Sequence, residues 1–281
     1  MTAVTGIDHV VIAVTDLDRA ATAYRKLGFT LSPRALHGSA MGTANHTIML
    51  RHDYFELLAV MTPTDRNRRW RDALAAGEGV VGLAAATAGA AQTQAAWRQA
   101  GLSPGDIIAF SRPVERPGGI VTDARFEIVS LPPETLPGLS LFACAQLTRN
   151  AVWLPELMVH PNTATAIEKL TVAVPDPAEA SRAWRRVLPE ATLAPIEDGM
   201  RLRVARHAID LIDPPSAARR CRLAKPPGRA RAVALDLAVG SVAACRAALA
   251  RGGVTAEIDG ELTRVGAGQA CGVAMTFAPA P

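Results

Sequence analysis

The distribution of apolar and polar residues along the chain repeats four times. The first copy is the β-branched run from Val10 to Val14, followed by Thr15 and Asp16, either of which can cap a helix, and by a helical stretch that reaches Lys26. Gly28 can take the left-handed conformation that ends a helix. This order of apolar run, capping residue and amphipathic stretch predicts a strand, a turn and a helix.

Three later segments have the same order, and they begin at Glu78, Ile167 and Ala232. In the third copy we expect Asp176 as the cap and Pro177 as the first helical residue, where the missing amide proton costs nothing. Short alternating segments follow each helix, as at residues 46–50 and 54–60. One helix for every three or four strands predicts βαβββ units and the α+β class rather than a doubly wound sheet.

Pairing of the units follows from their apolar faces. Each unit has one sheet face that cannot remain in contact with water, so two units should cover each other. Four units in 281 residues are about 70 residues each. We therefore predict two domains of two units, over residues 1–155 and residues 156–281, with the candidate chemistry in the first.

Two polar residues interrupt the apolar strands of the first unit. His9 lies in the opening strand and Glu56 in the closing strand. A buried imidazole or carboxylate without a partner is costly, so each needs a hydrogen bond or a metal ion. If the two strands are neighbours, both side chains can face one cavity, where they are suitable ligands for a first-row divalent ion.

Several segments of the chain resemble the vicinal oxygen chelate superfamily, specifically its glyoxalase-like branch. They are the opening IDHVVIAV, the segments GTANHTIML and YFELLAV, and the later ACAQLTRNAVWLPELMVHPNTA. The resemblance implies that paired units form two cupped mixed half-barrels with the helices outside. It also implies that the floor of a cup binds a divalent metal that chelates two adjacent oxygens of a substrate, for lyase, isomerase or ring-cleaving dioxygenase chemistry. Some members of the family only bind a ligand.

The resemblance also implies a set of metal ligands. His9 matches the histidine of the first strand, and Glu56 matches the acid that closes the first unit. Gln146 stands where the branch usually has a histidine, and an amide oxygen suits a hard ion better than zinc. Gly82 takes the place of His9 in the second unit and can bind nothing. We therefore expect Mn²⁺, Mg²⁺ or Fe²⁺ at this site, or no ion if the site is degenerate.

The C-terminal half departs further from this pattern. Lys169 and Ala234 take the place of His9 in the third and fourth units, and only Asp210 corresponds to Glu56. We expect no metal site in this half and predict a structural role for it.

Three further residues are expected to line the cup of the first half: Asn45, His46 and Cys144. A neutral imidazole at His46 could act as an acid or base near neutral pH, and the alternative is a half-exposed residue without a role. The apolar neighbours of Cys144 favour an inert buried thiol. His160 is expected to fix the crossover between the halves. The sequence does not identify a catalytic base.

Composition narrows the choice of partners and compartment. The chain has 30 Lys and Arg against 26 Asp and Glu, yet aromatic residues make up only 4% of it. Because single-strand binders interleave aromatic and basic residues, we expect no nucleic acid. The few aromatic residues favour a small aliphatic or carboxylated ligand over a large aromatic one. No apolar run reaches the ~20 residues of a membrane helix. The four dispersed cysteines and the lack of a signal peptide predict a cytoplasmic protein. Homodimer formation stays open.

Two functions remain open at this point. One is a divalent-metal-dependent lyase or isomerase acting on a small oxygen-rich metabolite, in which the ion polarises a carbonyl group. Dioxygenase chemistry is the less favoured reaction. The alternative is a non-catalytic binding or sequestration protein of the bleomycin-resistance type. Gly82 and Gln146 favour this alternative because they leave the metal site incomplete.

Overall fold

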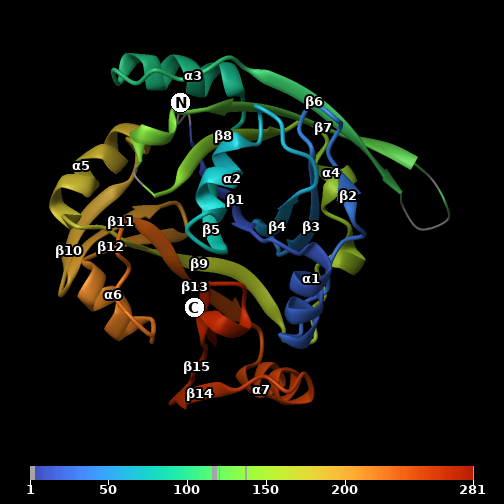
Figure 1. Ribbon diagram of the computed structural model, residues 1–281, viewed down its shortest axis with the longest axis vertical. Helices are drawn as coiled ribbons and strands as arrows, with labels where there is room; N and C mark the ends of the chain where they lie inside the picture. The colour runs from blue at the N-terminus through green and yellow to red at the C-terminus, as the bar shows by residue number, and fades with distance from the viewer. Residues whose placement is uncertain (1–3, 116–118, 120, 137, 281) are drawn as a thin grey trace.

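Four repeats of one βαβββ unit make up the structure (Figure 1). The computed structural model describes residues 4–115, 119, 121–136 and 138–280. The first unit contains β1 (Gly6–Ala13), α1 (Leu17–Lys26), β2 (Ala35–Leu36), β3 (Thr43–Met49) and β4 (Tyr54–Val60), and the second contains β5 (Gly79–Ala86), α3 (Ala90–Gln99), β6 (Ile108–Glu115), β7 (Val121–Ser130) and β8 (Ser140–Gln146). The predicted α+β class is confirmed.

The C-terminal half repeats this order. Its third unit contains β9 (Ala164–Ala173), α5 (Pro177–Val187), β10 (Thr192–Ile196), β11 (Gly199–Val204) and β12 (His207–Ile212). Its fourth unit contains β13 (Arg231–Val239), α7 (Val242–Arg251), β14 (Ala256–Asp259), β15 (Leu262–Val265) and β16 (Ala274–Pro279). In the described structure, three short α-helices lie between these elements: α2 (Arg68–Leu74), α4 (Arg149–Val152) and α6 (Pro214–Arg220). In the described parts of the chain, each helix is too short or too polar to cross a lipid bilayer.

The helix starts that the sequence predicts are present. Of the two candidate caps of α1, Asp16 accepts hydrogen bonds from the amides of Asp18 and Arg19, whereas Thr15 donates its amide and hydroxyl to Glu78. Asp176 caps α5 in the same way, at 2.9 Å from the amide nitrogen of Glu179. These side chains satisfy amides of the first turn that have no partner within the helix.

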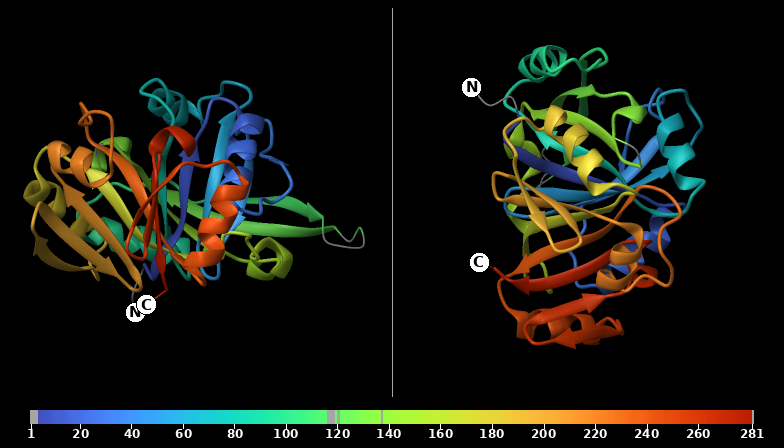
Figure 2. Two further views of the ribbon diagram at one scale, coloured as in Figure 1. Left: turned by 90° about the horizontal axis from the view of Figure 1, so that it is seen from below. Right: turned by 90° about the vertical axis from the view of Figure 1, so that its left-hand side faces the viewer.

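The strands form two eight-stranded sheets of the same topology. Sheet A has the order β2-β3-β4-β1-β5-β8-β7-β6 and sheet B the order β10-β11-β12-β9-β13-β16-β15-β14. Each central pair, β1 with β5 and β9 with β13, is antiparallel, and it joins two units into one sheet. Sheet A curls into a half-barrel, and the right-hand view of Figure 2 shows the N-terminal half above the orange and red strands of the fourth unit.

A single apolar core joins the two sheets. It contains alternate residues of β1, such as Val10 and Ile12, together with Leu170 of β9 and Leu235 of β13. The intervening residues of β1, such as Val11, belong to a second apolar cluster on the opposite face of sheet A. One face of each sheet is therefore buried against the other sheet and the helices, and the opposite face of sheet A lines an open cup. This core joins the two halves of the chain. The predicted domain boundary at residue 155 stays a prediction.

Buried polar groups fix one half to the other. The carboxylate of Asp53, in the turn between β3 and β4, accepts from the amide of Ile167 at 3.0 Å and from Nε2 of His207 at 3.1 Å. Nδ1 of His207 accepts from the amide of Ile7 at 3.2 Å. His160 acts similarly, since its Nδ1 accepts from the amide of Thr30 and its Nε2 donates to the carbonyl of Met49.

We expect Asp53→Ala to lower the free energy of unfolding by about 3 kcal/mol, because it leaves the buried donors of Ile167 and His207 without an acceptor. Guanidinium chloride denaturation measures the change. The control is Asp72→Ala, which removes an exposed carboxylate paired with Arg68 and should leave the midpoint unchanged. Equal shifts for the two variants would contradict the role of Asp53.

The fold should lose stability in acid through His160. Burial lowers the pKa of this imidazole below its ordinary value, and the bond to the Met49 carbonyl only partly opposes the effect. As the pH falls, His160 therefore takes up a proton in the unfolded chain before it does so in the folded one. Its contribution to the free energy of unfolding is complete above a pH of about 6.5 and is lost as the pH drops toward the lowered pKa of the folded state. His160→Gln, which does not titrate, should show a flatter decline between pH 6.5 and 5 in thermal denaturation. A decline as steep as that of the unaltered protein would count against this assignment.

Candidate functional site

The cup of sheet A encloses a cavity of about 360 Å³. Its floor is formed by side chains of β1, β3, β4, β7 and β8, and its rim by α2, residues 36–41 and the start of β6. His9, Asn45, Glu56 and Cys144, which the sequence indicates as site residues, all line it.

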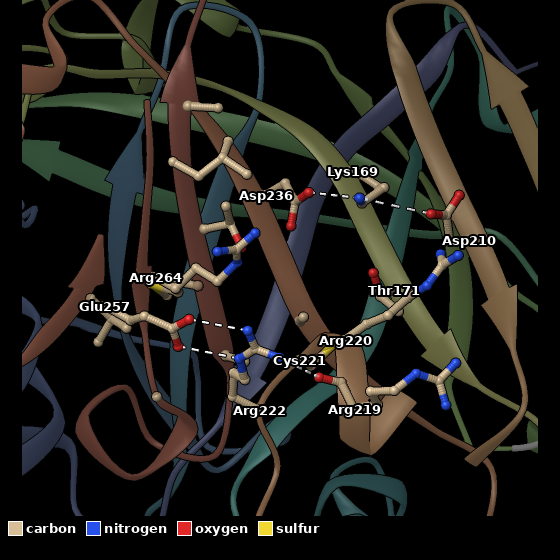
Figure 3. Close-up of a pocket in the computed structure, with 18 of the residues that line it drawn as sticks. Lys169, Thr171, Asp210, Arg219, Arg220, Cys221, Arg222, Asp236, Glu257 and Arg264 are labelled. Atoms are coloured by element: carbon tan, nitrogen blue, oxygen red, sulfur yellow. Dashed lines mark hydrogen bonds and ion pairs between the residues drawn. The ribbon is translucent and has the colours of Figure 1, made fainter. Parts of the chain in front are cut away.

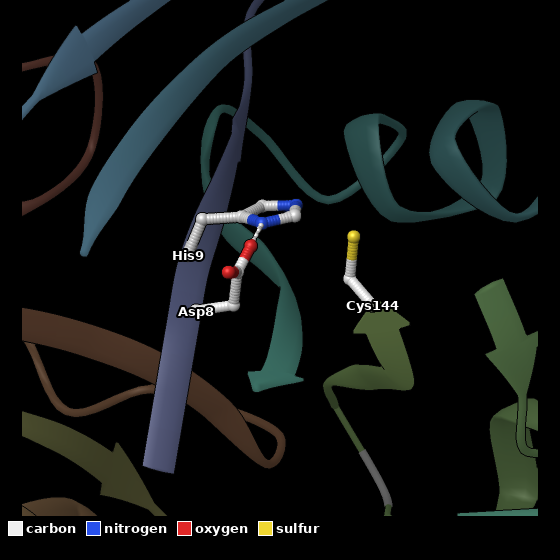
Figure 4. Close-up of side chains that lie close together, drawn as sticks. All are labelled: Asp8, His9 and Cys144. Carbon is white, nitrogen blue, oxygen red and sulfur yellow. Dashed lines mark hydrogen bonds and ion pairs between the residues drawn. The ribbon is translucent and has the colours of Figure 1, made fainter. Parts of the chain in front are cut away.

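A β-bulge in β1 places two neighbouring side chains together. The register between β1 and β5 shifts between Ile7 and His9, so Asp8 is an extra residue in the pairing. Nδ1 of His9 lies 2.7 Å from Oδ2 of Asp8 (Figure 4). A carboxylate partner holds the ring proton on Nδ1, which leaves Nε2 as the atom able to accept a proton or bind a metal.

Glu56 lies between two imidazoles. Its Oε2 is 4.0 Å from Nε2 of His9, and its Oε1 is 3.8 Å from Nε2 of His37. Nδ1 of His37 is bonded to the hydroxyl of Thr43 at 2.7 Å. Burial lowers the pKa of His37 despite the nearby Glu56 carboxylate, so this ring is neutral at pH 7.

Asn45 and Tyr54 hold this group in place. Nδ2 of Asn45 donates to Oε1 of Glu56 at 2.5 Å, while its Oδ1 is buried without a hydrogen-bond partner in the described structure. The ring of Tyr54 stacks on His9 with the centroids 4.4 Å apart. The orientation of His9 and Glu56 is therefore fixed by packing and hydrogen bonds, and one buried acceptor remains free.

Gln146 contacts the Asp8–His9 pair but is not among the residues that line the cavity. Its Nε2 donates to Oδ2 of Asp8 at 3.0 Å and lies 3.5 Å from the hydroxyl of Tyr54. Its Oε1 is buried and has no hydrogen-bond partner among the described residues. The amide thus supports the Asp8–His9 pair in this structure, and ligation of a metal by Gln146 stays a prediction.

Cys144 and His46 occupy different faces of the sheet. The sulfur of Cys144 points toward Asp8 and His9 (Figure 4), and ligand atoms of these three residues lie within 4.8 Å of one another. Burial raises the pKa of this thiol well above its ordinary value, which keeps it protonated. His46 instead bonds to the carbonyl of Ser32 at 2.8 Å, on the face of β3 that points away from the cavity.

The register of the second unit explains why it has no equivalent of His9 or Glu56. Glu56 pairs with Val11, and by the same count Phe142 of β8 pairs with Ala84. Phe142 is therefore the counterpart of Glu56. A Cβ atom at Gly82, the counterpart of His9, would lie 2.9 Å from Cη2 of Trp70. The indole of α2 fills the space that a ligand side chain would need.

Charged and aromatic residues complete the cavity. One acidic residue, Glu56, lines the cavity in the described structure. Three arginines also line it: Arg66, Arg69 and Arg112. The chain has 4 Trp, 2 Tyr and 6 Phe, and five of these line the cavity: Tyr54, Trp70, Phe110, Phe126 and Phe142. The low aromatic content therefore does not exclude an aromatic ligand, because the few aromatic residues are concentrated at this site.

Sheet B carries a second cavity, of about 630 Å³, with different chemistry (Figure 3). Lys169 stands at the position of His9 and lies 2.7 Å from Asp236 and 3.7 Å from Asp210. Four arginines of the lining are paired with acids: Arg219, Arg220, Arg222 and Arg264. The charges of this cavity are thus largely satisfied within the protein.

A family model described as "Glyoxalase-like domain" matches residues 7–188, more than half of the chain. This chain belongs to the glyoxalase-like domain family. The match includes the first two units, with His9 and Glu56. No curated protein matches the sequence significantly.

Solved structures of similar fold cover nearly the whole glyoxalase-like chain. A hypothetical protein from Staphylococcus aureus has a TM-score of 0.70 at 10% identity, with 98% of this chain and 99% of that chain covered. A mutant of 4-hydroxymandelate synthase from Streptomyces coelicolor has a TM-score of 0.59 at 13% identity, with 99% of this chain and 92% of that chain covered. The Mn(II)-bound glyoxalase from Novosphingobium aromaticivorans has a TM-score of 0.56 at 12% identity, with 99% of this chain and 82% of that chain covered. At these identities the likeness shows the fold alone.

If Trp70 fills the position opposite Gly82, then Gly82→Ala should destabilise this glyoxalase-like domain by about 1–3 kcal/mol, because the added methyl group clashes with the packed indole. The penalty should shrink in a Trp70→Leu background, as a double-mutant cycle by chemical denaturation will show. Gly228→Ala is the matched control, since a Cβ there meets no atom within 4 Å. An unchanged penalty in the Trp70→Leu background would contradict the assignment.

Proposed function

We propose that the cup of sheet A binds a divalent metal ion and presents it to a small oxygen-rich ligand, and that the protein is a metal-dependent lyase or isomerase. The observation that carries the proposal is the position of Glu56, whose two oxygens face Nε2 of His9 and Nε2 of His37 at 4.0 and 3.8 Å. Two imidazoles and one carboxylate are donors that suit Mn²⁺ or Fe²⁺ and leave positions open for a ligand. Their donor atoms do not all lie within 4.8 Å of one another, so binding would draw the three side chains together.

The surrounding residues fit a metal at this point. Asp8 and Thr43 each bind the Nδ1 side of one imidazole, so both Nε2 atoms are directed to Glu56. Asn45 holds one oxygen of Glu56, and its own unpartnered Oδ1 would gain a donor from water or ligand bound in the cup. His37 would thus supply the third ligand where the sequence predicts Gln146.

The remaining chemistry belongs to the cup itself. A bound ion would polarise a ligand oxygen as a Lewis acid. Tyr54 and Phe142 pack against His9, and Trp70 lines the same cavity. These rings reduce the contact of His9 with water, which strengthens electrostatic interactions inside the cup. The Mn(II)-bound glyoxalase among the similar structures supports the metal. One fold hosts several reactions, so turnover of a substrate is what distinguishes a lyase from an isomerase here.

Calorimetric titration of Mn²⁺ into EDTA-stripped protein tests the donor set. We expect His9→Ala and His37→Ala to weaken Mn²⁺ binding by at least ~10-fold, because each removes one nitrogen ligand, and Asp8→Asn to weaken it ~10- to 100-fold through the orientation of His9. His46→Ala is the matched control and should bind as the unaltered protein does, because this ring faces away from the cavity.

The same titration distinguishes His37 from Gln146. If His37→Ala weakens binding more than Gln146→Ala does, His37 is the third ligand. The reverse order would assign that place to Gln146. If neither Mn²⁺, Fe²⁺ nor Mg²⁺ binds the unaltered protein, the metal-dependent function is wrong.

A second function is favoured by a separate observation. Trp70 and Phe142 occupy the positions at which the second unit would supply the equivalents of His9 and Glu56, so the three proposed donors all come from the first unit. A cup with this arrangement could bind its small molecule without transforming it. In that case a ligand should bind the cup with unchanged affinity in His9→Ala, whereas the metal-dependent function predicts weaker binding.

A further inference from the structure

Arg69 is a charged group inside the cup without an acidic partner. It belongs to α2, and its guanidinium carbon lies 4.2 Å from the centroid of the Trp70 ring and 5.5 Å from that of Phe142. Nη1 donates to the hydroxyl of Ser130 at 3.2 Å. Nε is buried and unbonded, and in the described structure no carboxylate lies within ion-pair distance of this side chain.

This arrangement is unfavourable unless an anion completes it. Burial lowers the pKa of Arg69 to about 10, and the Glu56 carboxylate elsewhere in the cup opposes the effect only in part. The group is still charged at pH 7. A buried cation that lacks a counter-ion loses much of its hydration energy, so most proteins pair such groups. Other arginines of this chain follow that rule, as Arg201 does with Asp210.

The neighbouring charges point to an anion as well. Arg66 and Arg112 also line the cavity, and neither forms an ion pair within the described part of the chain. Glu56 is the acid that faces them from the floor. Three cations and one carboxylate give the cup a net positive charge, which raises the local concentration of anionic ligands.

The wall beside Arg69 is apolar. Phe110 and Phe126 stack with their ring centroids 5.1 Å apart, and Phe142 lies below the guanidinium. A fully hydrated anion gains nothing from such a wall. A ligand with an apolar body and one terminal oxyanion fits both features.

We propose that Arg69 binds the carboxylate of a ligand whose apolar body packs on Phe110, Phe126 and Phe142. Guanidinium and carboxylate are both planar and can form parallel charge-assisted hydrogen bonds. The Trp70 and Phe142 rings near the guanidinium limit its movement. This assignment rests on the proposed function only in taking the cup of sheet A as the ligand site, since it needs no metal.

The test compares ligands that differ only in charge. 3-Phenylpropionate and its neutral amide, 3-phenylpropionamide, are titrated into EDTA-stripped protein, with binding followed by calorimetry and by intrinsic tryptophan fluorescence. We expect the acid to bind at least ~10-fold more tightly than the amide. Arg69→Met, which keeps the apolar stem, should abolish this preference, and Arg69→Lys should restore it only in part.

Controls separate binding from folding. Arg68→Met alters an exposed arginine of the same helix and should leave the preference intact. Because Arg69→Met removes an unpaired buried charge, it should unfold at the same temperature or a higher one, so a loss of binding cannot be ascribed to misfolding. Equal binding of acid and amide to the unaltered protein, or an undiminished preference in Arg69→Met, would overturn the proposal.

Two further arms identify the oxyanion and the dependence on metal. Phenyl phosphate should bind more weakly than 3-phenylpropionate, and tighter binding of the phosphate would overturn the carboxylate assignment. His9→Ala should retain the preference for the acid. If Mn²⁺ fails to bind while this preference persists, the metal-dependent function is wrong and the carboxylate site stands. If Mn²⁺ binds and the preference for the acid is absent, the carboxylate site is wrong and the metal-dependent function stands.

Discussion

The burial of one face of each sheet against the other is the constraint on which the rest of the structure depends. Because Val10 and Ile12 of β1 must enter the core shared with β9 and β13, the alternate residues His9 and Val11 must face the cup. The bulge at Asp8 adds one residue to this alternation and brings a carboxylate beside the imidazole. The chemistry of the cup therefore follows from the register of a strand whose other face is held by the core.

The two cups show how one fold can carry unlike chemistry. At corresponding positions the first has His9 and Glu56, and the second has Lys169 and Asp210. Lys169 is neutralised by two aspartates, whereas Nε of Arg69 and Oδ1 of Asn45 in the first cup have no hydrogen-bond partner among the described residues. Since buried polar groups are nearly always paired, unpaired ones gathered in one cavity indicate where a ligand completes the structure.

Local signals in the sequence are sufficient for the architecture. Two helix starts are marked by the capping residues Asp16 and Asp176. The end of α1 is marked by Gly28, whose φ is +81°. The adjacency of His9 and Glu56 follows from the parallel pairing of β1 with β4. The position of Gln146 does not follow from a motif, because strand register decides which residue of β8 is the counterpart of Glu56, and that residue is Phe142.

Other residues of the cup have no local signal. His37 follows a strand of two residues, and Arg69 and Trp70 lie in a seven-residue helix between units, so neither periodicity nor spacing directs them to the cavity. Only the three-dimensional packing of α2 on β5 brings Trp70 to Gly82 and Arg69 to Phe142. The sequence predicts the strands that carry the site, and the connections between them supply much of its specificity.

The most direct test of the metal site is anomalous scattering at the manganese edge from crystals soaked in Mn²⁺. The account predicts one strong peak in the cup of sheet A, roughly 2.0–2.3 Å from Nε2 of His9 and from an oxygen of Glu56, with Nε2 of His37 completing the set. A peak between Asp8 and Cys144, a peak in the cavity of sheet B, or no peak at all would contradict it.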